Sequence, residues 1–149
     1  MAADEPPLDE QQWFAPQWLE DHFWGLWNGN LVAENVLWYF ASSPFYDRMS
    51  NNATIFQQLF GREHQHILFN VDLLEARLKN MQGVEFVIAE QPANPGPGFA
   101  GVWAIRKQRR TKRPGEEDEV SVLNTYTIVE GKISMAPTAA DLLKNSMVC

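Results

Sequence analysis

The sequence predicts an α+β fold: an antiparallel sheet of about four strands, packed with N-terminal helices and one C-terminal helix. Two observations support this prediction. The apolar period is helical up to about residue 82 and changes to an alternating one from residue 84 onward. The connections between the predicted strands are also short, and short connections join antiparallel neighbours, because parallel pairs need a crossover of a dozen or more residues.

Composition narrows the class of protein. The 149 residues are 45% hydrophobic and 21% charged, which fits a folded chain with one core. We expect a disordered acidic lead-in over 1–12 and a single domain over 13–149. The net charge of −7 disfavours nucleic acid as the main ligand. A single cysteine, Cys149, allows no internal disulfide, and neither a signal peptide nor a membrane-spanning run is evident, so we expect an intracellular soluble protein.

Two short helices are expected first. The first helix covers residues 35–41, with Asn35 as its candidate cap. It stops before Pro44, because proline disfavours the helical state for the residue that precedes it. A second helix covers 54–60, with either Asn51 or Asn52 as its cap.

The third helix has the clearest pattern. It covers 70–82, with Asn70 as its cap and an apolar stripe at spacings of three and four. Gly83 stands where a helix-ending left-handed residue belongs. A last helix is expected to open at Thr138, which Asp141 follows three residues later in a variant of the capping box.

Four strands are expected over 84–90, 99–110, 119–129 and 132–136, with a tight turn at Glu130 and Gly131 closing the final hairpin. Alternation in the third strand should place one set of side chains on a single face: Val120, Val122, Asn124, Tyr126 and Ile128.

No catalytic or cofactor site is expected. His64 and His66 flank one residue and could supply two metal ligands, but nothing near them supplies a third and fourth. The candidate nucleophiles Ser42, Ser43 and Cys149 lie in no nucleophile signature. We therefore predict a protein that is not an enzyme, with no metal and no cofactor.

The basic run over 106–113 is the strongest signal for a binding site, since it holds six of the twelve Lys and Arg residues. Strand alternation sends Lys107 and Arg109 to one side, and Arg106, Gln108 and Arg110 to the other. Three interpretations remain open. The run can be one arm of a solvated hairpin neutralised by the acidic residues 116–119, a contact for another protein, or a nucleic-acid-binding module.

Aromatic residues are concentrated near the N-terminus, where six occur within 13–27. They can complete the core or anchor the chain in a partner, because Trp and Tyr carry much of the energy of protein interfaces. We expect a mixture in which Trp13 and Trp18 pack inside, while Trp24 and Trp27 are exposed for docking.

Several blocks resemble the Mediator subunit 6 family. The run NVLWYFASSPFYDRMSNN over 35–52 resembles the family signature, and WAIRKQRR over 103–110 resembles its basic strand. Further blocks resemble it in the same order: PLDE followed by Trp13, Pro16 and Trp18, then GVEFV over 83–87 and YTIVEGKISMAP over 126–137. One departure is Trp38, where the family usually carries an acidic residue. Family members generally continue in a C-terminal extension, so the chain is interpreted as lacking one.

The resemblance implies a nuclear, non-enzymatic subunit of the Mediator head module, near its junction with the middle module. It implies contacts with other Mediator subunits, a coactivator role in RNA polymerase II transcription, and a hetero-oligomer without membrane or direct nucleic-acid contact. Within this frame, the predicted interaction residues are Trp24, Trp27, Lys107, Arg109 and Arg110.

The SPFYD block is predicted to form a rigid structural corner. Pro44 ends the helix, Phe45 and Tyr46 anchor the bend in the core, and either Asp47 or Asn51 caps the second helix. Together with Asn35, these residues make up the predicted structural motif.

Overall fold

The structure is a computed structural model that describes residues 12–16, 30–59, 70–93 and 100–136. None of the described helices is long and apolar enough to cross a membrane. The final helix expected from Thr138 lies outside the described residues, as does all of the predicted lead-in except Gln12. The elements follow one another as β1 (Gln12–Trp13), α2 (Val36–Ala41), α3 (Asn51–Leu59), α4 (Val71–Leu78), β2 (Gly83–Glu90), β3 (Val102–Thr111), β4 (Glu119–Val129) and β5 (Lys132–Met135).

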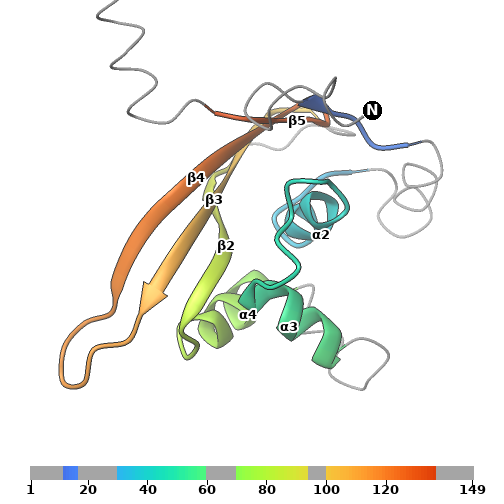
Figure 1. Cartoon of the computed structure of the whole chain (residues 1–149). Coiled ribbons are helices and arrows are strands. Elements are labelled where there is room, and N and C mark those ends of the chain that lie inside the picture. Colours follow the sequence, from blue (N-terminus) through green and yellow to red (C-terminus); the bar gives the residue numbers. More distant parts are fainter. Residues whose placement is uncertain (1–11, 17–29, 60–69, 94–99, 137–149) are drawn as a thin grey trace, which may run out of the picture.

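The five strands form one antiparallel sheet in the order β1-β5-β4-β3-β2. This confirms the predicted α+β class, with one strand more than the four expected. The additional strand, β1, pairs Trp13 with Ile133. Its two residues are too few to show an alternating pattern in the sequence. In Figure 1 the helices gather beside the sheet, and the far ends of β3 and β4 project beyond them as a long hairpin.

The short helices form where expected, with Asn35 at the N-cap position of α2 as predicted, but the predicted cap of α3 is wrong. The Asn35 side chain makes no capping bond to α2. It accepts from the Val32 amide at 2.9 Å and donates to the Asn30 carbonyl at 2.8 Å, both in the preceding loop. The cap of α3 is Ser50, whose hydroxyl accepts from the Ala53 amide at 3.2 Å. Asn51 and Asn52 both lie inside the helix.

The α4 helix keeps its predicted cap but is shorter than predicted. Asn70 accepts a hydrogen bond from the Leu73 amide at 3.1 Å. The helix ends at Leu78, where Lys79 is its C-cap, so Gly83 does not end it. Gly83 opens β2 instead, with a φ of 128° that favours glycine.

The core lies between the sheet and the helices and is rich in aromatic rings. Phe40 of α2 lies 5.1 Å from the Phe86 ring of β2 and 5.0 Å from the Tyr126 ring of β4. Trp103 and Ile105 of β3 are fully buried beside them. At the opposite end of the sheet, the Tyr39 hydroxyl donates to the Gly131 carbonyl in the β4–β5 turn, tying α2 to the hairpin.

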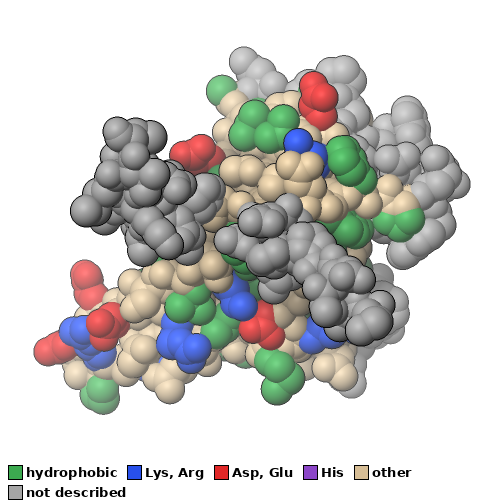
Figure 2. Space-filling model, turned by 45° about the horizontal axis from the view of Figure 1, so that its top comes forward, with side chains coloured by type: hydrophobic (Ala, Val, Ile, Leu, Met, Phe, Trp, Pro, Cys, Tyr) green, Lys and Arg blue, Asp and Glu red, His purple; other side chains and the backbone are tan. Residues whose placement is uncertain are grey.

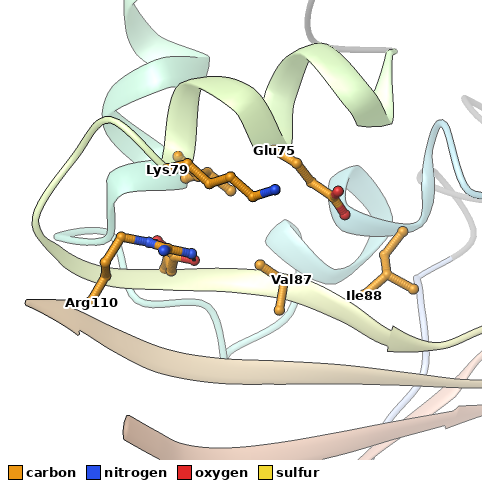
Figure 3. A pocket seen from close by; sticks show the side chains of 7 residues that line it. Glu75, Lys79, Val87, Ile88 and Arg110 are labelled. Atoms are coloured by element: carbon orange, nitrogen blue, oxygen red, sulfur yellow. Dashed lines mark hydrogen bonds and ion pairs between the residues drawn. The ribbon is translucent and has the colours of Figure 1, made fainter. Parts of the chain in front are cut away.

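The edge strand β2 is covered on both of its faces. Phe86 points toward α2. Because successive residues of a strand point to opposite faces, the neighbouring Glu85 points to the face away from α2. Figure 3 shows α4 lying over that second face, with Glu75 and Lys79 of the helix above Val87 and Arg110. Glu85 is thereby fully buried.

Candidate protein-interaction surface

The SPFYD block forms a corner packed against the sheet. Phe45 is buried, with its ring 5.3 Å from the ring of Tyr126. Tyr46 stacks on Phe86 at 5.4 Å, and burial raises its pKa to about 12. Pro44 lies exposed at the outside of the bend, three residues after the end of α2. Asp47 accepts a hydrogen bond from the Met49 amide at 2.8 Å, which fixes the next turn and leaves Ser50 to cap the helix.

Lys107 is held by this corner. Its ammonium lies 3.4 Å from the Asp47 carboxylate and 5.9 Å above the centre of the Phe86 ring. Such a contact with an aromatic face is attractive because the ring face is electron-rich. The sequence predicts that Lys107 projects toward a partner, but this structure directs it inward and makes it a tie between the corner and β3.

Arg110 is also engaged within the chain, in a cluster around the buried Glu85. Its guanidinium forms a two-pronged contact with the Glu85 carboxylate, at 2.9 Å from Nε to Oε1 and 3.0 Å from Nη2 to Oε2. Gln108 donates to Oε2 at 2.8 Å. A third contact joins Arg110 Nη1 to Asp118 at 3.0 Å. Hydrogen bonding to Glu85 raises the pKa of Arg110, so the guanidinium stays charged.

Arg109 is exposed, and no described residue forms an ion pair with it. It extends from the same face of β3 as Lys107, as alternation predicts, but two residues farther out along the hairpin. Of the three interaction residues predicted on this strand, only Arg109 has a side chain open to a partner. Trp24 and Trp27 lie outside the described residues, as does Trp18, while Trp13 is half-buried with its ring 5.7 Å from that of Tyr39.

The charged end of the hairpin is largely neutralised within itself. Arg113 lies 2.8 Å from Glu119 and 3.4 Å from Glu116, and Lys112 lies 3.0 Å from Asp118. Hydrogen bonding to Lys112 lowers the pKa of Asp118, with Arg110 adding to the effect. In Figure 2, blue and red side chains interleave at the lower left, where the hairpin projects. The acidic arm therefore returns beside the basic arm, as one of the three interpretations of the sequence holds.

The sequence did not reveal the role of Asn52. Its side-chain amide donates to the Phe86 carbonyl at 2.9 Å and accepts from the Phe86 amide at 2.7 Å, so it occupies the outer edge of β2 in the way a neighbouring strand would. The adjacent Asn51, predicted as a cap, has a buried amide nitrogen without a hydrogen-bond partner among the described residues.

The two candidate nucleophiles that the structure describes, Ser42 and Ser43, both donate hydrogen bonds to backbone carbonyls. Ser43 is buried and its hydroxyl donates to the Phe40 carbonyl at 2.7 Å, which makes it part of the end of α2. Ser42 donates weakly to the Trp38 carbonyl at 3.4 Å. His64, His66 and Cys149 lie outside the described residues. Within the described ranges, no three His, Cys, Asp or Glu side chains are grouped so as to hold a metal ion.

Comparison with known proteins decides the family. The family described as "MED6 mediator sub complex component" matches residues 11–149. The chain belongs to the Med6 family. It is 43% identical to the Mediator of RNA polymerase II transcription subunit 6 of Neurospora crassa, over 94% of this chain and 40% of that protein. With the subunit of Emericella nidulans the identity is 39%, over 99% of this chain and 47% of the relative. The chain thus spans less than half the length of these relatives.

Solved structures of the Med6 family share the fold. The Schizosaccharomyces pombe Mediator subunit Med6 aligns with a TM-score of 0.66 and 33% identity, covering 97% of this chain and 87% of the other. A chain of the Schizosaccharomyces pombe Mediator head module aligns with a TM-score of 0.62 and 33% identity, covering 95% and 79%.

Two sequence blocks that resemble the Med6 family meet in this structure. The SPFYD block contributes Asp47 and the basic strand block contributes Lys107, and these two residues form the ion pair that closes the corner. The SNN end of the first block contributes Asn52, which binds the backbone of the GVEFV block at Phe86. Much of what these blocks encode is therefore the fold itself.

Proposed function

We propose that this chain is a non-enzymatic architectural subunit of a nuclear Mediator coactivator complex, supporting assembly of the head module and through it the regulation of RNA polymerase II transcription. The observation that carries the proposal is the match over nearly the whole chain to the Schizosaccharomyces pombe subunit Med6 and to a chain of the Schizosaccharomyces pombe Mediator head module. The described side chains agree with such a role, because their polar contacts join parts of the fold. Asn52 binds the backbone of β2, Gln108 binds Glu85, and Lys107 pairs with Asp47.

The proposed partners are other head subunits, with the junction to the middle module and RNA polymerase II reached through the assembled complex. Arg109 is the residue of β3 that we assign to partner contact, since its guanidinium is exposed and unpaired among the described residues. Trp24 and Trp27 are proposed as aromatic anchors. Lys107 and Arg110 are proposed to act indirectly, by holding the hairpin at a fixed angle to the helices.

The alternative, a nucleic-acid-binding module on residues 106–113, has less support. Four of the six cations in that run are paired with carboxylates of the same chain, and only Arg106 and Arg109 have no such partner in the described ranges. The net charge of −7 also opposes binding to phosphates. We expect a Kd for duplex DNA no tighter than about 10⁻⁵ M at physiological salt, typical of weak non-specific binding.

Co-expression with the other head subunits, followed by gel filtration, tests the proposal. The chain should elute with the head subunits as one stoichiometric complex. A variant in which Ser43 is replaced by Ala and both His64 and His66 by Gln should assemble and support transcription as well as the wild type. Elution of the chain apart from the head subunits, or loss of transcription support in that variant while assembly is intact, would contradict the architectural role.

A further inference from the structure

The β4 strand is paired on both sides for only part of its length. Its last residues pair with β5, from Tyr126↔Met135 to Val129↔Lys132. Beyond them, the Ala136 amide donates to the Thr125 carbonyl at 2.8 Å. No described strand lies on that side of residues 119–124, although β3 pairs with them on the other side. This stretch is hereafter the open edge.

Hydrogen bonds elsewhere fix which backbone groups of the open edge point outward. Asn52 occupies the amide and carbonyl of Phe86, so the residue opposite, Lys107, directs its backbone groups toward β4. The backbone groups of Arg109, two residues farther along β3, also point toward β4, where its partner is Ser121. The backbone groups of the neighbours of Ser121, at positions 120 and 122, therefore point away from β3.

A hydrogen bond farther along β4 supports the same assignment of which backbone groups point away from β3. Arg106 alternates with Lys107 and directs its backbone groups toward β2, so its partner Thr125 must point away from β3. The Thr125 carbonyl does so, because it accepts from Ala136. Val120 and Val122 thus present N–H and C=O groups at the open edge, ready to pair with an added strand.

A bulge turns the side chains of this stretch away from the core. Lys107 pairs with Asn124 and Gln108 with Val122, so Leu123 is an extra residue in β4. The sequence places Val120 and Val122 on the face of Tyr126, and this prediction is wrong because the bulge moves them to the face of Glu85. There Val120 and Val122 are 41% and 57% exposed.

The two faces of the open edge differ in chemistry. One carries the exposed aliphatic side chains of Val120 and Val122. The other carries Ser121, which lies opposite Arg109 in the ladder, and Arg109 has no ion-pair partner among the described residues. A strand added at this edge would place alternate residues on these two faces. Its apolar residues would meet the valines, and an acidic residue on the other face would meet Arg109.

We propose that the open edge of β4 is a docking site for an extended segment of another Mediator head subunit, a segment in which apolar and acidic residues alternate. The proposal rests on the proposed function for its partner. The open edge holds two valines and a leucine, contains no proline and carries one acidic residue, Glu119, whose charge is paired with Arg113. Edge strands that avoid pairing usually carry lysine, proline or a bulge. The open edge carries neither lysine nor proline, and its bulge at Leu123 follows Val120 and Val122 in the strand.

Amide hydrogen exchange of the full chain, alone and in the reconstituted head module, tests this directly. In the isolated chain the amides of Val120 and Val122 should exchange fast, while those of Ser121 and Asn124, which face β3, should exchange slowly. In the head module, Val120 and Val122 should become at least about tenfold slower, since each would gain a backbone hydrogen bond. Slow exchange of both valine amides in the isolated chain at all concentrations would show that the chain itself covers the edge and would overturn the proposal.

A matched pair of variants isolates the edge from general effects. Val120→Lys should weaken incorporation into the head module by at least about tenfold, because lysine blocks strand addition. Val129→Lys is the control, since Val129 is equally exposed, at 40% against 41%, but already pairs with β5. Val122→Pro removes one outward N–H and should act like Val120→Lys, with circular dichroism checking that the fold survives.

The remaining outcomes separate this proposal from the proposed function. If the chain assembles normally but the valine amides stay fast and Val120→Lys has no effect, the docking site is wrong while the architectural role stands. Failure of the wild-type chain to assemble at all would instead overturn both. Concentration-dependent dimerisation of the isolated chain that protects the same amides would identify a second copy as the occupant and overturn the choice of partner. Arg109→Glu should weaken incorporation, and no change would contradict the acidic character of the segment.

Discussion

Replacing Arg110 by Met should destabilise the chain by about 3 kcal/mol, because it leaves a buried carboxylate without its cation. Glu85 is fully buried and receives three hydrogen bonds, two of them from Arg110 at 2.9 and 3.0 Å. Removing one partner of a buried ion pair typically costs about 3–5 kcal/mol. We take the lower end because the Arg110 side chain remains 12% exposed, so water can partly solvate the carboxylate after the change. Gln108 also keeps its hydrogen bond to Glu85.

Urea unfolding followed by circular dichroism measures this loss. For a slope of about 2 kcal/mol per molar urea, the midpoint should fall by about 1.5 M. Arg109→Met is the matched control, since it removes the same charge one residue away, from an exposed side chain with no described ion pair, and should shift stability by under about 0.5 kcal/mol. Equal midpoints for the two variants would refute the assignment of Arg110 to the fold and return it to the binding surface.

Three further perturbations test other parts of the structure. Phe45→Ala should cost about 3–5 kcal/mol in thermal unfolding because its ring is buried, and an unchanged melting temperature would make the corner a docking surface instead. Asn52→Ala should cost about 2–3 kcal/mol in urea by leaving the β2 backbone without partners, with Asn51→Ala as the smaller control; equal losses would contradict the edge role. Burial raises the pKa of Tyr46 above its unfolded value of 10.0 to about 12, so the neutral phenol stabilises the fold fully below pH 10 and this stability, about 3 kcal/mol, is lost as pH rises to 12. Tyr46→Phe should flatten the alkaline unfolding profile, and an unchanged slope would exclude Tyr46 as its source.

Elements long enough to show a repeating apolar pattern could be predicted from the sequence. Elements that depend on one contact with a distant part of the chain could not. The strands at 84–90 and 119–129 and the cap at Asn70 could be predicted from alternation and local hydrogen bonding. The two-residue strand β1 could not, because it exists only through its pairing with β5. The bulge at Leu123 coincides with a break in the alternation, where the apolar pair Val122 and Leu123 precedes the polar pair Asn124 and Thr125. The predicted regular strand passed over this break.

The candidate site was harder to predict, because the ionic partners are distant in sequence. Lys107 pairs with Asp47 and Arg110 with Glu85, separations of 60 and 25 residues that no local pattern encodes. The acidic residues at 116–119 were close enough in sequence to be predicted as neutralising neighbours. The sequence gives the order of these charged residues along the chain. It does not show which guanidinium is buried by the fold and which faces solvent.

The most direct test of the central claim is a binding experiment with the full chain immobilised on a surface. One analyte is a reconstituted head module that lacks its own Med6 subunit, and the other is duplex DNA of random sequence, both at physiological salt. The account predicts saturable one-to-one binding of the head module and a Kd for DNA no tighter than about 10⁻⁵ M. Submicromolar, salt-sensitive binding of DNA that is lost in a double Arg106→Glu, Arg109→Glu variant, together with no binding of the head module, would contradict it.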